Sequence, residues 1–304
     1  VEQWRFETNE RILSPPVIED DLLVLASDDG DIITLNSNTG NPHQIIGTGE
    51  RISSGISVID ITGNETNKAV SVGTVYGNVY CYDLLTLDPL WTQQLAFGSS
   101  EISIVSSIVH SDNKIFFFDN KGTLYCYSAA NGMLIWKLEA SNNGWKSREQ
   151  VSNSQVIVDN NLYLIDVAGN LFCVDALLGK VKWNIKNISA NGLIRLNNHQ
   201  DLILPTKNNK VVIVSQKLGQ VINEIELPLE TSEEAISDLV VIGDNIIVGF
   251  SNGWVYKIQA KQKAARFFCG GLAPIISLTN VDGNCLVTDY DGKFTLLNLS
   301  TSKK

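Results

Sequence analysis

The chain has 304 residues, of which 44% are hydrophobic and 18% charged, a balance typical of a globular protein. Its formal net charge of −10 disfavours a nucleic-acid partner, because an acidic surface repels phosphate backbones, and makes basic protein segments or cations the better electrostatic match. No apolar stretch approaches the roughly 18 residues of a membrane-spanning helix, so no transmembrane segment is predicted.

Apolar strands and polar turns alternate along the chain in a unit that repeats. The clearest pair of copies, residues 113–136 and 160–183, matches position for position at an offset of 47. Each copy contains an apolar strand, a polar turn that ends in Gly, a second apolar strand, and a Gly turn before a strand that starts near Trp. Alternating, β-branched and aromatic residues predict strands. The Gly permits the positive φ of a tight hairpin.

The same hairpin turn recurs seven times, at intervals of 39 to 47 residues. Asn replaces Gly once, and Asn also tolerates the left-handed conformation. A further apolar strand precedes each hairpin, which makes four strands per copy. Units of this length are typical of propeller blades, so we predict an all-β, seven-bladed β-propeller of four-stranded antiparallel blades, a single domain over residues 1–304. The hairpin centres are Gly30, Gly77, Gly122, Gly169, Asn209, Gly253 and Gly292.

The two ends of the chain complement each other. The seventh copy stops after its third strand, whereas the chain begins with VEQWRFE, and Trp4–Glu7 is similar to Trp136–Glu139 in an outer strand. We predict that residues 1–8 form the outer strand of the last blade and close the ring, which removes the open edges of a linear array. The alternative is a frayed N-terminus beside an incomplete blade.

The pattern of apolar strand, Gly turn, LYCYD-like strand, second turn and Trp resembles the PQQ-like (quinoprotein-type) repeat over essentially the whole chain. The match is best around Tyr80–Asp83, Tyr125–Ser128 and Phe172–Asp175. The resemblance implies that the Trp packs between adjacent blades, which suits its large apolar body. It specifies a fold and not a function, because this fold carries many unrelated sites. The repeat Trp appears as Trp4, Trp91, Trp136 and Trp183, and is replaced by Gln44 and Asn223 and, in the sixth copy, by Phe267 or Phe268.

The resemblance also raises the hypothesis of a quinoprotein dehydrogenase. Family members that bind the quinone are longer and eight-bladed, with two adjacent cysteines and a calcium site beside a catalytic Asp. This chain has no adjacent cysteines, and no calcium set aligns with it. We therefore predict no catalytic residue, no metal ligand, and neither PQQ nor calcium. A channel-based enzyme that binds a ligand, cation or quinone remains the alternative hypothesis.

Three of the five cysteines, Cys81, Cys126 and Cys173, occupy one repeat position. We interpret them as small buried residues, too far apart for disulfides. Cys269 and Cys285 lie outside this series. An odd number of thiols favours a reducing, cytoplasmic compartment, whereas members of the family are often periplasmic or extracytoplasmic.

A Glu precedes the first strand of five copies. Loops that enter inner strands meet at one mouth of a propeller channel, where several carboxylates would raise one another's pKa and concentrate cations. One hypothesis is a mouth that binds basic peptides or a metal; the other is a solvated loop charge inherited by repeat duplication. The residues are Glu10, Glu50, Glu101, Glu149 and Glu234.

The longest irregular insertion, residues 141–150, carries Trp145 and Arg148. Trp145 is off the repeat position. An exposed aromatic beside basic residues is typical of an interface anchor, but the ring could also fold down over the channel.

These observations favour a non-catalytic protein-interaction scaffold that uses the rim loops and the channel mouth, acting as a monomer. Scaffolds of this kind in the family include periplasmic proteins that help to assemble outer-membrane proteins. Because the chain begins at Val1 rather than Met, it is also consistent with a mature chain or with a domain of a larger protein. The fifth copy lacks both the turn Gly and the Trp, which indicates either relaxed packing or a functional face.

Overall fold

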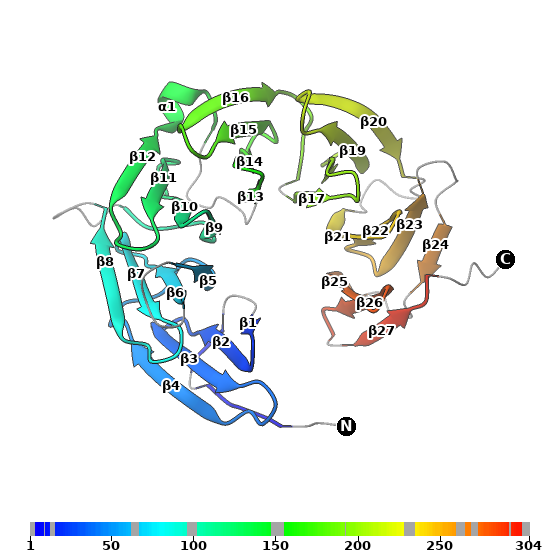
Figure 1. The fold of residues 1–304 in the computed structure, drawn as a ribbon. Coiled ribbons are helices and arrows are strands. Elements are labelled where there is room, and N and C mark those ends of the chain that lie inside the picture. Colours follow the sequence, from blue (N-terminus) through cyan, green and yellow to red (C-terminus); the bar gives the residue numbers. More distant parts are fainter. Residues whose placement is uncertain are drawn as a thin grey trace. The chain divides into compact units, whose positions relative to one another are not determined.

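The structure is a computed structural model and consists of β-strands and one short helix, α1 (Ala140–Asn143) (Figure 1). It divides into two compact units, Val1–Val167 with Cys173–Lys182 (unit 1) and Ala168–Phe172 with Trp183–Lys304 (unit 2). The predicted single domain over 1–304 stays a prediction. The residues described are 4–8, 10–12, 16–61, 67–95, 102–146, 155–191, 193–227, 235–259, 265–268, 273–291 and 293–299.

The first sixteen strands form four antiparallel sheets, each with its strands in chain order. The fourth of these sheets contains residues of both units. The strands are β1 (Val17–Glu19), β2 (Leu22–Ala26), β3 (Asp31–Asn36), β4 (Pro42–Gly47), β5 (Ser57–Asp60), β6 (Lys68–Gly73), β7 (Asn78–Asp83), β8 (Pro89–Gln94), β9 (Val109–Ser111), β10 (Lys114–Phe118), β11 (Leu124–Ser128), β12 (Leu134–Leu138), β13 (Gln155–Val158), β14 (Asn161–Ile165), β15 (Leu171–Asp175) and β16 (Lys180–Ile185).

The remaining strands, in unit 2, form two sheets of four strands and one of three among the described residues. All seven predicted copies are therefore antiparallel sheets, and the all-β prediction is confirmed. The strands are β17 (Arg195–Leu196), β18 (Leu202–Pro205), β19 (Lys210–Ser215), β20 (Gln220–Glu226), β21 (Ile236–Ile242), β22 (Asn245–Phe250), β23 (Trp254–Gln259), β24 (Ala265–Phe268), β25 (Ile275–Val281), β26 (Asn284–Asp289) and β27 (Phe294–Leu297).

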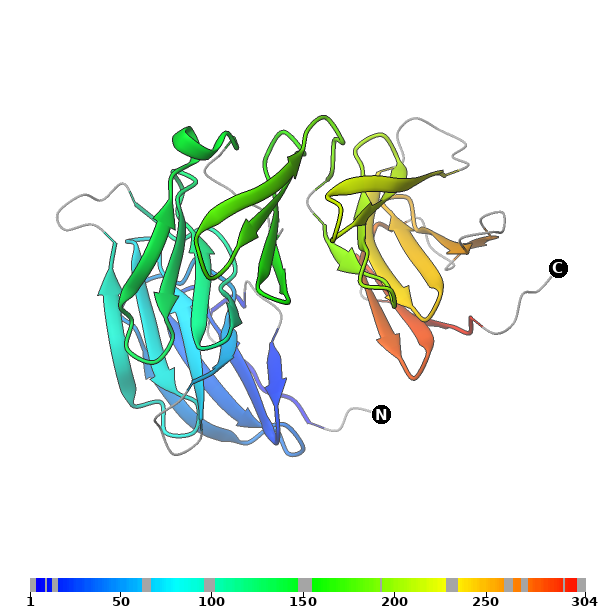
Figure 2. The ribbon, with the colours of Figure 1, turned by 45° about the horizontal axis from the view of Figure 1, so that its top comes forward.

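The first strands of successive sheets contact each other within each unit. In unit 1, β1 contacts β5 and β5 contacts β9; in unit 2, β17 contacts β21 and β21 contacts β25. Figure 2 shows the first three sheets of unit 1 stacked face to face. In a chain-order antiparallel sheet, the turns after the first and third strands lie at one end and the hairpin between the second and third strands at the other.

The hairpin turns have the backbone conformation that the repeat predicts. Gly77 and Gly122 both take φ +77°, and Asn209 takes φ +58° in the fifth sheet. A buried side chain three residues before the turn Gly stabilises the turn. Before Gly122, the Asp119 carboxylate accepts hydrogen bonds from the Lys121 and Thr123 backbone N–H groups. The substitution of Gly by Asn therefore leaves the fifth hairpin intact.

A Trp on the fourth strand packs against the next sheet. Trp91 donates its indole N–H to the Ala129 carbonyl at 2.7 Å, and its ring lies 2.6 Å from where a Cβ on Gly132 would stand. Only Gly fits beneath the ring at this left-handed turn, so the predicted packing of the Trp is confirmed. The same contact joins Trp136 to Gly179, Trp183 to Gly219, and Trp4 to Gly40.

The junction between the first and second sheets departs from this rule. Gln44 stands in the Trp position, opposite Thr34, and the turn residue beneath it is Leu87 rather than Gly. Leu87 keeps the left-handed φ, at +55°, but is only 3% exposed. Its side chain occupies space that a Trp ring would exclude, so the two substitutions compensate for each other.

In the sixth sheet, the predicted residue in the Trp position, Phe267 or Phe268, is wrong. The backbone register pairs Lys257 with Ala265, four residues after the hairpin Gly253. Ala265, not Phe267 or Phe268, therefore occupies the position of the Trp in that sheet. A one-residue pattern could not locate it, because the sequence alone does not give the backbone register of β24 against β23.

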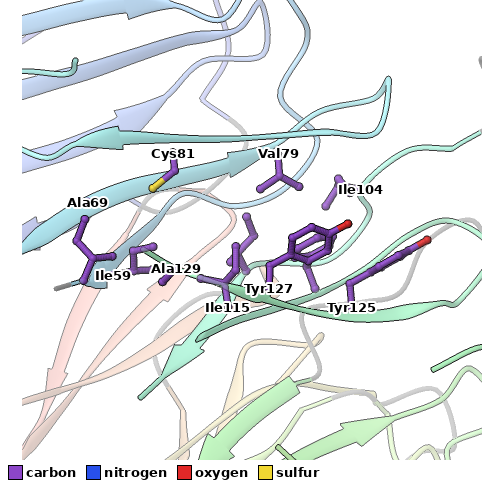
Figure 3. Close-up of a cluster of buried hydrophobic side chains, with 12 residues drawn as sticks. Ile59, Ala69, Val79, Cys81, Ile104, Ile115, Tyr125, Tyr127 and Ala129 are labelled. Carbon is purple, nitrogen blue, oxygen red and sulfur yellow. The ribbon is translucent and has the colours of Figure 1, made fainter. Parts of the chain in front are cut away.

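The core consists of clusters between successive sheets. One of them joins the second and third sheets, with Ile59, Cys81, Ile115 and Phe117 at most 1% exposed (Figure 3). Burial raises the pKa of the Cys81 and Cys126 thiols to about 12 and that of Cys173 to about 11. All three are core residues without disulfides, as predicted. Cys285 is also buried, and Cys269 lies outside the described residues.

The last sheet contains three strands, and residues 4–8 at the N-terminus are not assigned as a strand. Residues 1–3 lie outside the described part of the chain. Trp4 and Phe6 pack on the first sheet, against Leu25, Ile33 and Leu35. The predicted closure of the ring by residues 1–8 stays a prediction.

Candidate functional site

Glu50, in the loop before β5, is bound by the hairpin of the second sheet. Its two carboxylate oxygens accept hydrogen bonds from the Thr74 hydroxyl and the Asn78 side-chain amide, both at 2.7 Å. Burial, and then the Glu50 charge, raise the pKa of the neighbouring Tyr80. Glu50 therefore fastens its loop to the next hairpin, and both of its oxygens are engaged.

The other predicted site residues are not brought together with it among the described residues. Glu10 is exposed, in the segment before the first sheet. Glu101, Arg148, Glu149 and Glu234 lie outside the described residues. The hypothesis of a carboxylate-lined mouth therefore stays a prediction.

Trp145 is not an exposed anchor. It is 5% exposed and packs edge-on against Phe118, with ring centroids 6.3 Å apart. Its indole N–H donates to the Gly122 carbonyl at 2.9 Å. Of the two alternatives for Trp145, the exposed aromatic is contradicted, because its ring packs on the third hairpin, at Gly122 and Phe118.

Charged side chains that the sequence did not single out converge on the first strands of unit 1. The Lys68 ammonium forms ion pairs with Glu19 and, at 3.5 Å, with Asp60. The hydrogen bond to Glu19 raises the pKa of Lys68. His110, on β9, is half-buried, and burial lowers its pKa against the opposing effect of Asp60. Asp60 and Lys68 are cross-strand partners on β5 and β6, whereas Glu19 and His110 belong to the first and third sheets and approach them through the contacts of β5 with β1 and β9.

A groove of about 480 Å³ opens beside Lys68, at the junction of the first and second sheets. This is the junction where Gln44 and Leu87 replace the Trp and the Gly. His43 Nε2 lies 3.2 Å from the Leu85 carbonyl oxygen and donates to it. The only sequence signal for the groove was the missing Trp. Its lining residues are Glu19, Asp20, Asp21, Leu22, Asn36, His43, Lys68, Leu84 and Leu85.

Inner strands of unit 2 are also connected by a polar group. The Asp238 carboxylate pairs with Arg195 at 3.2 Å and accepts the Leu278 backbone N–H at 2.7 Å. Asp238 thus links β17, β21 and β25. In the part of the chain that the structure describes, no group of three or more His, Cys, Asp or Glu residues is arranged to hold a metal ion. The described residues likewise contain no helix with the length and apolarity needed to cross a membrane.

Known proteins share the architecture. BamB from Moraxella catarrhalis aligns with a TM-score of 0.73 at 17% identity, over 96% of this chain and 87% of that one. The computationally designed protein Ika8 aligns with a TM-score of 0.54 at 14% identity, over 96% and 97%. Raptor from Chaetomium thermophilum aligns with a TM-score of 0.62 at 12% identity, over 91% of this chain and 26% of its own. At these identities the likeness shows the fold alone.

No curated protein matches the sequence. A family model does: the one described as "Outer membrane protein assembly factor BamB" matches residues 2–184 and 77–303, which together span nearly the whole chain. With the repeated hairpins and the Trp–Gly junctions, this match confirms the predicted PQQ-like repeat. The chain belongs to the BamB-type family of PQQ-like β-propellers.

Proposed function

We propose that this protein is a non-catalytic protein-interaction scaffold. The observation that carries the proposal is the match, across nearly the whole chain, to a family described as an outer membrane protein assembly factor. The Trp–Gly junctions support it, because they hold neighbouring sheets rigidly and leave the turns available for recognition. The acidic balance, 33 acidic against 23 basic residues, favours partners with basic segments.

Two measurements test this proposal. The purified chain, coupled to beads, should enrich defined polypeptides from extracts of its own organism, and each should then bind in purified form with a saturable, salt-sensitive isotherm. A globular protein of equal net charge is the control. Absorbance and metal analysis of the purified chain supply the second test. A stoichiometric chromophore or calcium ion, or no enrichment over the control protein, would contradict the proposal.

We further propose that the N-terminal segment completes the last sheet and closes the ring. Trp4 donates to the Ser37 carbonyl at 3.0 Å and lies on Gly40, the contact that a fourth-strand Trp makes with the following sheet at every Trp junction. Meanwhile β27 exposes Phe294 and Leu296 at 68% and 58%, as expected of a strand that lacks its outer neighbour.

The repeat specifies the register of this closure. In the second and third sheets the Trp pairs with the residue four places after the hairpin Gly, Cys81 with Trp91 and Cys126 with Trp136. The equivalent residue in the last sheet is Leu296, opposite Trp4. This register sets Glu7 opposite Lys293. In the fifth sheet the corresponding residues, Glu226 and Lys210, form an ion pair at 3.0 Å.

A double-cysteine variant tests the closure. Arg5→Cys with Thr295→Cys places two thiols on directly opposed residues of the proposed pair, within reach of a disulfide. We expect oxidation to cross-link them, with the bond mapped by mass spectrometry, and to raise the melting temperature. Arg5→Cys with Leu297→Cys, shifted by two residues, is the matched control. Equal cross-linking in both variants, or none in the first, would contradict this register.

A further inference from the structure

The groove between the first two sheets arises where the repeat rule fails. At the other described junctions of unit 1 a Trp ring lies over the turn, as Trp91 does over Gly132. Here Gln44 is exposed, and His43 reaches only the Leu85 carbonyl. Beside this irregular junction lies a groove of about 480 Å³, which is within the usual range of ligand pockets, roughly 300–1,000 Å³.

The walls of this groove differ in chemistry. Leu22, Leu84 and Leu85 provide apolar surface, and Leu85 is 44% exposed. Asp20 and Asp21, in the turn between β1 and β2, are exposed and also line the groove. Such a surface suits a long cationic side chain, whose methylenes lie on the leucines while its charged end meets the carboxylates.

The basic residues of the groove do not cancel this preference. The Lys68 ammonium is already engaged by Glu19 and Asp60. His43 uses one ring nitrogen as a donor to Leu85. Two carboxylates therefore remain facing the groove without a cation: the polar neighbour of Asp21 is the neutral Asn38 amide, at 3.4 Å, and the structure gives Asp20 no partner among the described residues.

We propose that this groove binds an extended, basic and apolar segment of a protein partner, with a Lys or Arg side chain held between the leucines and Asp20 and Asp21. The inference rests on the proposed scaffold function and specifies where on unit 1 a partner binds and which side chain it inserts. Charge at a turn is not enough for such a site. Asp112 and Asp159 hold the same left-handed turn position in the third and fourth sheets, but there Trp136 and Trp183 occupy the junctions.

Nuclear magnetic resonance on the ¹⁵N-labelled chain tests the groove directly. The probe is the peptide acetyl-Gly-Leu-Arg-Leu-Lys-Gly-amide, and its counterpart carries Glu in place of Arg and Lys. We expect the basic peptide to shift the amide signals of Asp20, Leu22 and Leu85, and the acidic peptide to shift none of them. Asp20→Asn with Asp21→Asn should weaken binding about tenfold, because two exposed charge pairs are lost.

Asp112→Asn with Asp159→Asn is the matched control and should bind the basic peptide as the unaltered chain does. Asp20→Asn with Asp21→Asn changes only exposed side chains, so an unchanged spectrum elsewhere shows that the fold persists. Absence of shifts at millimolar peptide, shifts centred outside the groove, or equal weakening by both double variants would overturn the proposal. If the groove fails while purified partners still bind the whole chain, the scaffold function stands and its surface lies elsewhere.

Discussion

At the scale of single residues, the Trp–Gly contact is the most exacting feature of the molecule. A Cβ on Gly40, Gly132, Gly179 or Gly219 would lie 2.5–2.6 Å from a Trp ring atom, and each of these glycines has a positive φ. Leu87 shows that the turn itself accepts a side chain when no Trp lies above it. The identity of this turn residue is therefore set by the neighbouring sheet and not by the turn alone.

Gly132→Ala separates these two effects. The substitution adds a Cβ that collides with Trp91 and also strains the backbone at φ +67°, so we expect a loss of about 2–3 kcal/mol in the free energy of unfolding. Gly243→Ala is the control, since φ there is +57° and nothing lies within 4 Å of the new Cβ. Urea denaturation measures both variants. Equal losses would show that the Trp contact imposes no constraint.

At the scale of elements, the first strands of unit 1 carry a charged cluster whose energetics depend on pH. Burial lowers the pKa of His110, so its folded state favours the neutral ring. A His with a lowered pKa contributes stability that is present above its unfolded pKa, about 6.5, and is lost as the pH falls through the folded value.

His110→Gln removes this titration. We expect the free energy of unfolding of the unaltered chain to decrease between pH 7 and pH 5.5 by more than that of the variant. Denaturation curves of both proteins at the two pH values measure the change in unfolding free energy of each. The titrations of other groups cancel when the change in the variant is subtracted from that in the unaltered chain. A steeper decrease in the variant would mean that the carboxylates of Glu19 and Asp60 outweigh burial and raise the pKa of His110.

Much of the element order could be predicted from the sequence, because each hairpin repeats a local signal: a left-handed Gly or Asn between two apolar strands. The core position of Cys81, Cys126 and Cys173 followed from the same repeat. The Lys68 cluster could not be found in this way, since Glu19 and His110 reach the paired Asp60 and Lys68 only through contacts between strands of different sheets. Trp145 was ambiguous because an insertion has no counterpart in other copies. The groove had one sequence signal, the replacement of Trp by Gln44. This signal could be interpreted only once the structure showed the positions of Leu87 and His43.

At the scale of the whole molecule, the chain repeats one four-stranded unit and varies it at selected junctions. Regular junctions carry the Trp–Gly pair and contribute rigidity. The irregular junction between the first two sheets carries the groove and the charged cluster. The proposed binding site therefore lies where the chain departs from its repeat. If the ring closes through Trp4, the Trp4–Gly40 contact is one more regular Trp–Gly junction. The groove then lies at the next junction along the chain, between the first and second sheets.

Site-specific photo-cross-linking in the native cells tests whether a protein partner of this scaffold binds in the groove. A benzophenone side chain replaces Leu85, which lines the groove, or Leu177, which holds the same turn position in the fourth sheet and is 50% exposed. We expect a defined protein adduct from position 85 that disappears with Asp20→Asn and Asp21→Asn, and no such adduct from position 177. No adduct from either position, or the same adducts from both, would contradict the binding of a partner in the groove.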